Sequence, residues 1–228
     1  MPKHGKKYIE KKKLVDAAKT YPLPEAMSLV KKTSTAKFDA SVEVHLKLGI
    51  DTAKGEEQVR GTVSLPHGTG KAKRVAVFAD GPKAEEAVAA GAEKVGGKEL
   101  VDEIKANKKL DGIDVVVATP KMMPLLAPVA KILGPRGLMP SLKSDTVTEN
   151  IGATVAALKK GKADFRNDTG GNLHQLVGKT SWEEAKLIEN VKILLEAVRK
   201  AKPAKSKGTF IRGVVVCATM GPAVNVQL

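Results

Sequence analysis

A basic arm at the start of the chain, PKHGKKYIEKKK, has the residue type and spacing best suited to contact with phosphate. Lys3, Lys6 and Lys7 are followed by three consecutive lysines at 11–13. Lysines that meet phosphates displace counterions and bind nucleic acid with little selectivity for sequence. The alternative is a solvated tail, and the residues alone leave both interpretations open.

Three further stretches could form a shaped contact surface. Residues 36–39 place a lysine and Phe38 directly before an alternating segment, and for Phe38 packing in a core is the alternative to a contact. Residues 219–222 (TMGP) form a turn whose glycine would let another backbone approach closely. Residues 134–140 hold two Gly, two Pro and Arg136, so a phosphate contact and a purely structural corner both remain open.

Catalytic and metal chemistry have little support in the sequence. None of the four histidines has a second ligand at metal-type spacing, and paired carboxylates such as Glu56–Glu57 are adjacent rather than convergent. His45 is expected at the surface, and Cys217, within VVVCA, as a small buried hydrophobic residue. We therefore predict no catalytic residue, no metal and no cofactor, and a protein that is not an enzyme.

A nucleotide-binding α/β enzyme is the competing class of function, because the middle of the chain alternates strands and helices. A Walker A loop requires G-x-x-x-x-G-K-[ST], and Gly70-Lys71-Ala72 lacks the hydroxyl. A dinucleotide fingerprint should follow a strand, whereas Gly68-Thr69-Gly70 precedes one. Both motifs fail in residue type and in context.

The composition favours a polyanion as partner. The 228 residues include 39 Lys or Arg and 25 Asp or Glu, a formal charge of +14. Nucleic acid is the first candidate and a membrane surface the second, with a scaffold that binds any polyanion as a third hypothesis. Aromatic residues make up 3% of the chain, too few for a single-strand binder built on rows of stacking rings.

A single cysteine excludes an intramolecular disulfide framework, and the N-terminus has no apolar secretory segment. No run approaches the 18 apolar residues of a membrane span. We therefore expect a cytoplasmic protein with no membrane partner.

The middle of the chain predicts parallel βαβ units. Strands are expected at 74–79 and 113–118, both rich in β-branched residues. Helices are expected at 82–90, at 98–108 and at 122–133, the last broken near Pro128.

The two ends of the chain predict an α+β arrangement. Residues 41–48 alternate strictly, as in a strand with one buried and one solvated face, and 58–65 could be its hairpin partner. A further strand is expected at 209–218. The remaining expectations are helices at 11–18, at 24–32 and at 182–200, the last with Ser181 as N-cap and an apolar stripe of Ile188, Val191, Leu194, Leu195 and Val198.

These patterns predict a discontinuous two-layer α+β domain (1–67 and 160–228) with an inserted Rossmann-like parallel α/β domain (68–159). Charge supports the division. The inserted segment has 14 Lys or Arg and 11 Asp or Glu, a net +3, whereas the flanks have 25 and 14, a net +11. We expect the outer domain to carry the nucleic-acid site.

Six blocks of the sequence resemble the family of bacterial large-subunit ribosomal protein one, and they occur in order over nearly the whole chain. They are MPKHGKKY at 1–8, TAKFDASVEVHLKLGID at 35–51, VRGTVSLPHGTGK at 59–71, ILGPRGLMP at 132–140, FRND at 165–168 and KGTFIRG with TMGP at 207–222.

The resemblance implies a discontinuous RNA-binding domain with an inserted Rossmann-like domain. It implies a structural protein that binds 23S rRNA of the large ribosomal subunit, forms its mobile stalk and assists release of deacylated tRNA from the exit site. It also implies a translational repressor that binds the mRNA of its own operon, and a chain that is monomeric when free of the ribosome.

The resemblance also implies the RNA-binding residues, which fall in the matching blocks and in the basic arm. They are Lys37, Phe38, Ser41, Glu43, Arg166, Asp168, Thr219, Met220 and Gly221, with Lys3, Lys6 and Lys7 adding affinity. Phe38 either stacks on a base or supports Met220, and we slightly favour support. Glu43 would accept a hydrogen bond from a 2′-hydroxyl or a base amino group and so distinguish RNA from DNA.

Overall fold

The structure is a computed structural model, and it describes residues 5–52, 54, 57–107, 112–204, 206 and 208–227. The chain divides into two compact units. Unit 1 comprises Met1–Gly70 and Ala163–Leu228, and unit 2 comprises Lys71–Lys162. The boundaries expected from the sequence lie at 67/68 and 159/160. Lys73 Nζ donates a hydrogen bond to the carbonyl of Lys162 (2.7 Å), so the two crossings of the chain lie side by side.

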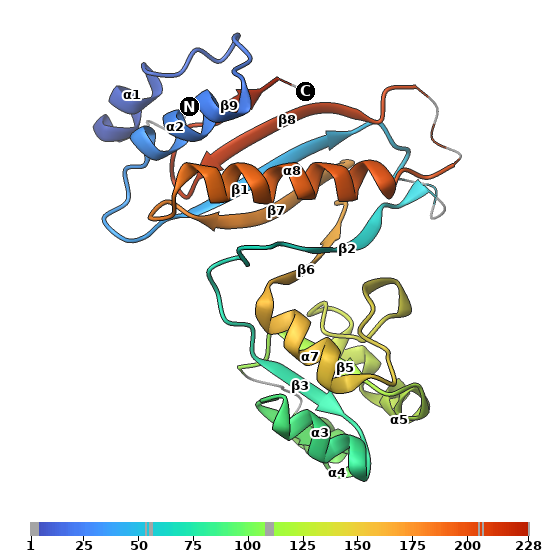
Figure 1. Ribbon diagram of the computed structural model, residues 1–228. Coiled ribbons are helices and arrows are strands. Elements are labelled where there is room, and N and C mark those ends of the chain that lie inside the picture. Colours follow the sequence, from blue (N-terminus) through green and yellow to red (C-terminus); the bar gives the residue numbers. More distant parts are fainter. Residues whose placement is uncertain are drawn as a thin grey trace. The chain divides into compact units, whose positions relative to one another are not determined.

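A four-stranded antiparallel sheet forms the centre of unit 1 (Figure 1). Its order is β7-β1-β8-β9, with β1 in the interior between two strands that come from beyond the inserted unit. The strands are β1 (Ser41–Leu48), β7 (Asn172–Lys179), β8 (Ile211–Ala218) and β9 (Val224–Val226).

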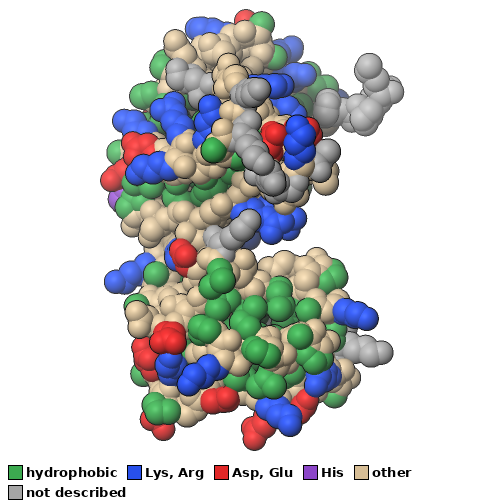
Figure 2. All heavy atoms as spheres, turned by 90° about the vertical axis from the view of Figure 1, so that its right-hand side faces the viewer, with side chains coloured by type: hydrophobic (Ala, Val, Ile, Leu, Met, Phe, Trp, Pro, Cys, Tyr) green, Lys and Arg blue, Asp and Glu red, His purple; other side chains and the backbone are tan. Residues whose placement is uncertain are grey.

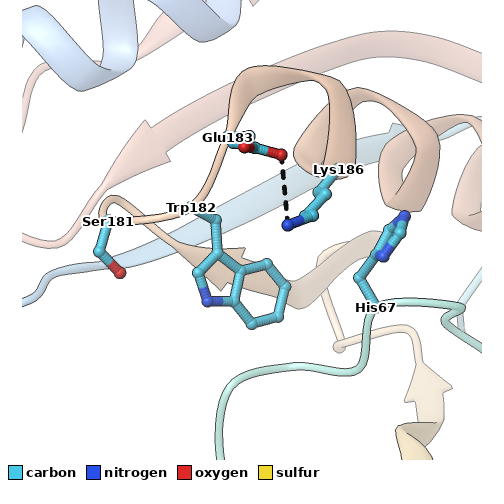
Figure 3. Close-up of a pocket in the computed structure, with 5 residues that line it drawn as sticks. All are labelled: His67, Ser181, Trp182, Glu183 and Lys186. Atoms are coloured by element: carbon cyan, nitrogen blue, oxygen red, sulfur yellow. Dashed lines mark ion pairs between the residues drawn. The ribbon is translucent and has the colours of Figure 1, made fainter.

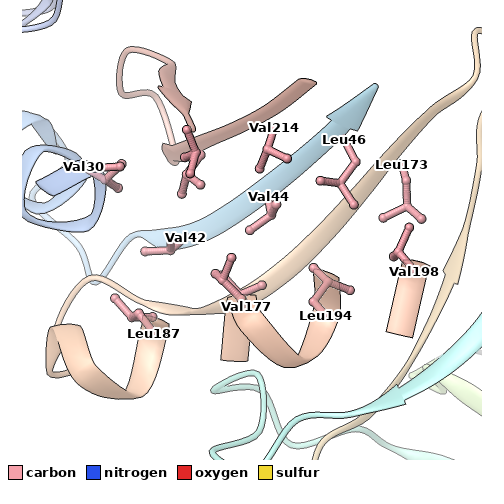
Figure 4. Close-up of a cluster of buried hydrophobic side chains, with 14 of the residues drawn as sticks. Val30, Val42, Val44, Leu46, Leu173, Val177, Leu187, Leu194, Val198 and Val214 are labelled. Carbon is pink, nitrogen blue, oxygen red and sulfur yellow. The ribbon is translucent and has the colours of Figure 1, made fainter. Parts of the chain in front are cut away.

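Strand β1 has the two faces that its alternation predicts. Val42, Val44, Leu46 and Leu48 are buried, and the intervening side chains lie on the opposite face. The buried face is covered by α2 (Leu23–Thr33) and α8 (Glu184–Lys200), as Figure 4 shows for the packing of Leu194 and Val198 below the strands. Because the helices cover only this side, the other face of the sheet remains open.

Helix α8 differs from its predicted form at its start and in its stripe. It begins at Glu184 with Glu183 as N-cap, and no side chain caps it. Ser181 is therefore not the N-cap; its hydroxyl donates to Asp39 Oδ2 (2.9 Å) instead. The buried stripe is centred on Leu187, Asn190, Val191, Leu194 and Val198, with Ile188 and Leu195 half-buried at its edge.

The hairpin prediction for 58–65 is wrong. Strand β2 (Arg60–Ser64) pairs with β6 (Lys162–Arg166) in a separate two-stranded ribbon, and the partners of β1 are β7 and β8. Val63 and Phe165 bury their side chains in the core of unit 1, so the ribbon packs as part of this unit. Neither β6 nor β7 was predicted as a strand.

The N-terminal helix is also displaced from its predicted position. Helix α1 spans Lys6–Lys12 rather than 11–18, and none of its residues is buried. Residues 13–18 form turns, in which Asp16 Oδ1 accepts a hydrogen bond from the Ala18 amide (2.9 Å). The helix is attached through Lys11, whose Nζ donates to the Lys32 carbonyl at the end of α2 (2.9 Å).

Unit 2 contains a three-stranded parallel sheet of order β4-β3-β5, which confirms the predicted class of an α+β unit with an inserted parallel α/β unit. Its strands and longer helices are β3 (Val75–Phe78), α3 (Pro82–Ala89), β4 (Lys94–Gly96), α4 (Lys98–Asn107), β5 (Val115–Ala118) and α7 (Ile151–Lys160).

Both faces of this sheet are covered, as expected for parallel strands. Val75 and Val77 point to the core beneath α3 and α7, whereas Ala76 and Phe78 point to the core beneath α4. β3 and β5 are therefore buried throughout, which explains their uninterrupted apolar sequence, whereas the edge strand β4 is half-buried.

The predicted helix at 122–133 is broken into four short pieces. The 3₁₀ turn Ala127–Val129 contains Pro128, so the break occurs where it was expected. The pieces are Pro120–Met122, α5 (Met123–Leu126), Ala127–Val129 and α6 (Ala130–Leu133). In the loop 134–140 that follows, Leu138 and Met139 pack on the core, and Arg136 is exposed.

The visible surface differs between the units in Figure 2: Lys and Arg side chains are spread over unit 1, and hydrophobic side chains gather on unit 2. Exposed large hydrophobic side chains of unit 2 include Val88, Leu125 and Leu142. Within the described part of the chain, no helix has the length and apolar character needed to cross a membrane.

A buried asparagine joins three parts of unit 1. Asn190 of α8 is fully buried, and its Nδ2 donates to the carbonyls of Gly68 (3.0 Å) and Val177 (2.8 Å). Its Oδ1 accepts from the His67 amide (3.4 Å). The side chain therefore holds the outgoing segment and β7 against the helix.

Replacing Asn190 with Ala should lower the free energy of unfolding of unit 1 by about 2–4 kcal/mol, because it leaves buried backbone groups without partners. Urea unfolding followed by circular dichroism measures the change. Lys192→Ala, at an exposed position of the same helix, is the control and should change stability by less than about 0.5 kcal/mol. Equal stability of the Asn190 variant and the wild type would contradict this role.

Candidate RNA-binding surface

The start of β1 and the end of β8 meet at one edge of the unit 1 sheet. The Thr219 amide donates to the Ser41 carbonyl (2.9 Å), and the Ser41 amide donates to Thr219 Oγ1 (3.2 Å). Antiparallel pairing of β1 with β8, with Val42 opposite Ala218, brings these residues together although they are far apart in sequence. The sequence blocks at 35–51 and 219–222 therefore form one surface.

Two large apolar side chains project from this edge. Phe38, just before β1, is 57% exposed, and Met220, just after β8, is 73% exposed. The interpretation of Phe38 as a core residue is therefore wrong. Exposed apolar side chains of this size at one edge are suited to packing against a partner.

Met220 also adopts a costly backbone conformation. Its φ is 62°, in the left-handed region that costs a non-glycine residue about 1–2 kcal/mol. The turn is closed by the Gly221 amide, which donates to the Ala218 carbonyl (2.8 Å). A Cβ on Gly221 would lie 3.2 Å from that same oxygen, so the turn favours glycine there. The turn thus holds the Met220 side chain outward.

Hydrogen bonds from β7 and the turn after it stabilise the approach to β1. Lys179 Nζ donates to Ser41 Oγ (3.0 Å), and Asp39 accepts hydrogen bonds from Thr180 Oγ1 and from the amide and hydroxyl of Ser181. This fixes the segment that carries the exposed Lys37 and Phe38. Asp39 belongs to the stretch 36–39 selected from the sequence, whereas Lys179 was not singled out.

Glu43 lies on the open face of β1, opposite Leu176 of β7 and Cys217 of β8. It is half-buried. Its negative charge adds to the burial that raises the pKa of Cys217, and it opposes the burial and the His174 interaction that together lower the pKa of His45. A carboxylate at this position can only accept hydrogen bonds.

The second predicted group lies near the other end of β1. Arg166 ends β6 and is exposed, and Asp168 lies in the turn between β6 and β7. Asp168 Oδ1 accepts from the Asn172 amide (2.6 Å) and Oδ2 from Asn172 Nδ2 (3.1 Å). These hydrogen bonds hold the pKa of Asp168 below its ordinary value, so it remains an anionic acceptor.

The two groups are separated along β1. The Asp168 amide donates to the Asn172 carbonyl, and Asn172 lies opposite Lys47, six residues beyond Ser41, which is about 20 Å at the rise of an antiparallel strand. The structure therefore does not bring all predicted residues to one point; it places them at the two ends of one open sheet face.

The middle of this face holds residues that the sequence analysis did not select. His45 of β1 lies against His174 of β7 (Nδ1 to Nδ1, 2.7 Å) and Cys217 of β8 (Nε2 to Sγ, 3.1 Å). Cys217 is half-buried on the open face, so its interpretation as a buried hydrophobic residue is wrong. The alternation of Val214, Val216 and Ala218 on the buried face was the available signal.

The basic arm is described only in part. Lys6 and Lys7 are exposed on α1, whereas Lys3 lies outside the described residues. Within the described residues, neither lysine forms a hydrogen bond or ion pair with the edge that carries Phe38 and Met220. Their role in binding phosphate stays a prediction.

Two cavities have none of the predicted RNA-binding residues in their lining. One, of about 470 Å³, is lined by His67, Ser181, Trp182, Glu183 and Lys186, with Glu183 and Lys186 forming an ion pair (3.2 Å; Figure 3). The other, of about 340 Å³, lies in unit 2 beyond the carboxyl ends of β3 and β5, where Asp80 and Thr119 line it. Among the residues that the structure covers, no group of three or more His, Cys, Asp or Glu side chains could hold a metal ion.

Comparison with known proteins assigns the chain to a family. Residues 30–222 match the Ribosomal protein L1p/L10e family. The whole chain is 54% identical to the large ribosomal subunit protein uL1 of Fervidobacterium nodosum and 53% identical to that of Thermosipho melanesiensis, and in each case the match covers 97% of the relative. The uL1 protein of Thermosipho africanus is 51% identical over the same share of both chains. The chain, with its open sheet face and its inserted parallel unit, therefore belongs to the ribosomal protein L1p/L10e family.

Proposed function

We propose that this chain binds 23S rRNA through the open face and edge of the unit 1 sheet. Family membership makes it a structural protein of the large ribosomal subunit and not an enzyme. The observation that carries the proposal is the edge at which Phe38 and Met220 project, exposed, on either side of the Ser41–Thr219 hydrogen bonds.

The chemistry of this surface suits an RNA minor groove. That groove is wide and shallow and displays 2′-hydroxyls, which hydroxyl, carboxylate and backbone groups can meet. Ser41, Thr219 and Glu43 supply such groups, and the backbone at Gly221 adds no bulk. Met220 packs against sugars and bases, whereas Lys37 supplies phosphate contact with little sequence information.

A binding titration tests the proposal directly. The full chain is titrated with the stalk fragment of 23S rRNA, with bulk tRNA as competitor, at several salt concentrations. Binding that survives competitor and moderate salt supports a shaped site, because a purely electrostatic interaction weakens steeply with salt. Binding that ignores the identity of the RNA would leave only the general attraction of a +14 chain for polyanions.

Two more specific roles, in tRNA release and in translational repression, belong to the same proposal. We propose that the protein forms the mobile stalk and assists release of deacylated exit-site tRNA, and that it represses translation of its own operon mRNA. Ribosomes with and without the protein should then differ in the rate at which deacylated tRNA leaves. Added free protein, which we expect to be monomeric, should lower translation of the operon mRNA in vitro and leave an unrelated message unchanged.

Replacing Met220 with Gly should weaken specific RNA binding without destabilising the protein. The side chain is lost from the contact, which should cost about 1.5–3 kcal/mol of binding free energy if it packs fully. Glycine tolerates the left-handed φ at this position, so thermal stability should hold. Titration with the rRNA fragment and a melting curve measure both effects.

The matched control is Leu142→Ala in unit 2, which removes another large exposed hydrophobic side chain (76% exposed). It should leave the affinity unchanged. Met220→Asp should weaken binding more than Lys12→Ala, because a carboxylate facing phosphate is repelled whereas an exposed lysine gives up one contact. Equal losses for Met220→Gly and Leu142→Ala would contradict the proposed surface.

A variant in which a short linker replaces residues 71–162 should retain most of the RNA affinity. The two crossings of the chain lie side by side at Lys73 and Lys162, so a short linker can close the gap. Circular dichroism checks that the variant folds, and the same titration measures its affinity. A folded variant that no longer binds would place the site outside unit 1.

A further inference from the structure

A row of four polar side chains crosses the open face of the unit 1 sheet from β8 through β1 to β7 and beyond it. Cys217 Sγ lies 3.1 Å from His45 Nε2, and His45 Nδ1 lies 2.7 Å from His174 Nδ1. His174 Nε2 lies 3.6 Å from Asp168 Oδ2. Both nitrogens of His45 are thus engaged within the protein.

The carboxylate at one end of the row and the thiol at the other together set the direction of the hydrogen bonds. Burial raises the pKa of Cys217, and Glu43 adds to the effect, so the group stays a thiol at neutral pH. The S–H is a weak donor and the sulfur a weak acceptor, so the thiol contact alone fits either direction. Asp168 can only accept, which favours a proton on His174 Nε2; His174 Nδ1 then accepts, a neutral His45 carries its proton on Nδ1, and the S–H donates to His45 Nε2.

The remaining steps follow from the chemistry of a neutral imidazole, which has one donor and one acceptor nitrogen. Burial lowers the pKa of His45 and the nearby His174 lowers it further, against the opposing charge of Glu43, which favours the neutral ring at neutral pH. Its Nδ1–H donates to His174 Nδ1, and the His174 proton is then on Nε2. The carboxylate of Asp168, which accepts only, favours the same tautomer.

The far end of the row is open to a partner. The side chain of His174 is 52% exposed, and its Nε2 faces Asp168 Oδ2 at 3.6 Å, a contact longer and weaker than a good hydrogen bond. The Nε2–H therefore lies on the open face, where an RNA oxygen can take the place of this weak contact.

We propose that Cys217 and His45 are positioning residues that fix His174 as an Nε2–H donor to an oxygen of the bound RNA. The proposal rests on the proposed function, since it adds a contact to that same surface. It also explains why a sheet face predicted to bind RNA carries a half-buried thiol at its centre.

Nitrogen-15 NMR of the histidine side chains in the full chain, without RNA, tests the relay. The wild type should show protonated Nδ1 in His45 and protonated Nε2 in His174. Cys217→Ser retains a hydroxyl donor and should keep this pattern, whereas Cys217→Ala should give mixed tautomers in His45. The opposite tautomers in the wild type, or an unchanged pattern in Cys217→Ala, would overturn the proposal.

Titration of the full chain with the 23S rRNA stalk fragment tests whether His174 donates a hydrogen bond to the RNA. His174→Ala should weaken binding about 3- to 10-fold, the effect of one lost hydrogen bond. His174→Gln, whose amide N–H can replace Nε2–H, should stay within about two-fold of the wild type. Unchanged affinity in His174→Ala would overturn the contact. His67→Ala, whose histidine pairs with Glu189 instead, is the matched control and should bind like the wild type.

Repeating the titration with a 2′-deoxy fragment identifies the acceptor. If the effect of His174→Ala disappears, the acceptor is a 2′-hydroxyl; if it persists, the acceptor belongs to a phosphate or a base, and both results support the donor. The experiments distinguish failure of this proposal from failure of the proposed function. If the wild type does not prefer the stalk fragment over competitor RNA, the proposed function is wrong. The NMR pattern tests the hydrogen bonds of Cys217, His45 and His174 independently of RNA.

Discussion

The pairing of β1 with β7 and β8 is the interaction on which unit 1 depends. β1 comes from the first 50 residues, and both partners come from beyond the inserted unit, so the ladder joins segments more than 100 residues apart in sequence. Each buried side chain of β1 packs beneath α2 and α8, and each outward side chain is positioned by the same backbone hydrogen bonds. The core and the proposed binding surface are thus two faces of one strand.

Unit 1 can fold only after both parts of the chain that form its central sheet are present. The ladder cannot close until the chain beyond residue 172 is available, and contacts of such long sequence separation slow folding. Unit 2, by contrast, is a continuous segment whose parallel strands are joined by short helical crossovers. The side-chain bonds of Asn190, Asp39 and Thr219 then secure the segments that enter and leave the central ladder.

Elements with an unambiguous pattern could be predicted from the sequence, and the others depend on tertiary context. β1 alternates strictly and β5 is wholly apolar, so both were predicted close to their observed bounds. β7 was missed because His174 and Gln175 interrupt its apolar residues, and only the neighbouring strands make it a strand. β2 was given the wrong partner because alternation fixes the faces of a strand and not its neighbour.

In the candidate site, too, some residues could be predicted from local sequence and others only from the fold. Residues in contiguous blocks, such as Phe38 with Ser41, were recognisable in the sequence, but the row of Cys217, His45 and His174 arises from register alone. No spacing in the sequence places a residue of β8 opposite one of β1. Cys217 was misjudged because its neighbours are apolar, although the alternation of β8 turns it toward solvent.

The acidic residues on this face argue for discrimination rather than affinity. Glu43 and Asp168 lie on the surface of a chain of charge +14, where carboxylates weaken any purely electrostatic hold on phosphate. Each is a fixed acceptor that a 2′-hydroxyl or an amino group can satisfy and a phosphate cannot. The lysines attract phosphate without sequence information. Because of that attraction, the surface can carry Glu43 and Asp168, whose carboxylates disfavour ligands that present no hydrogen-bond donor to them. If the proposed surface binds RNA, a groove that presents donors there should be accepted, and a polyanion that presents only phosphates should not.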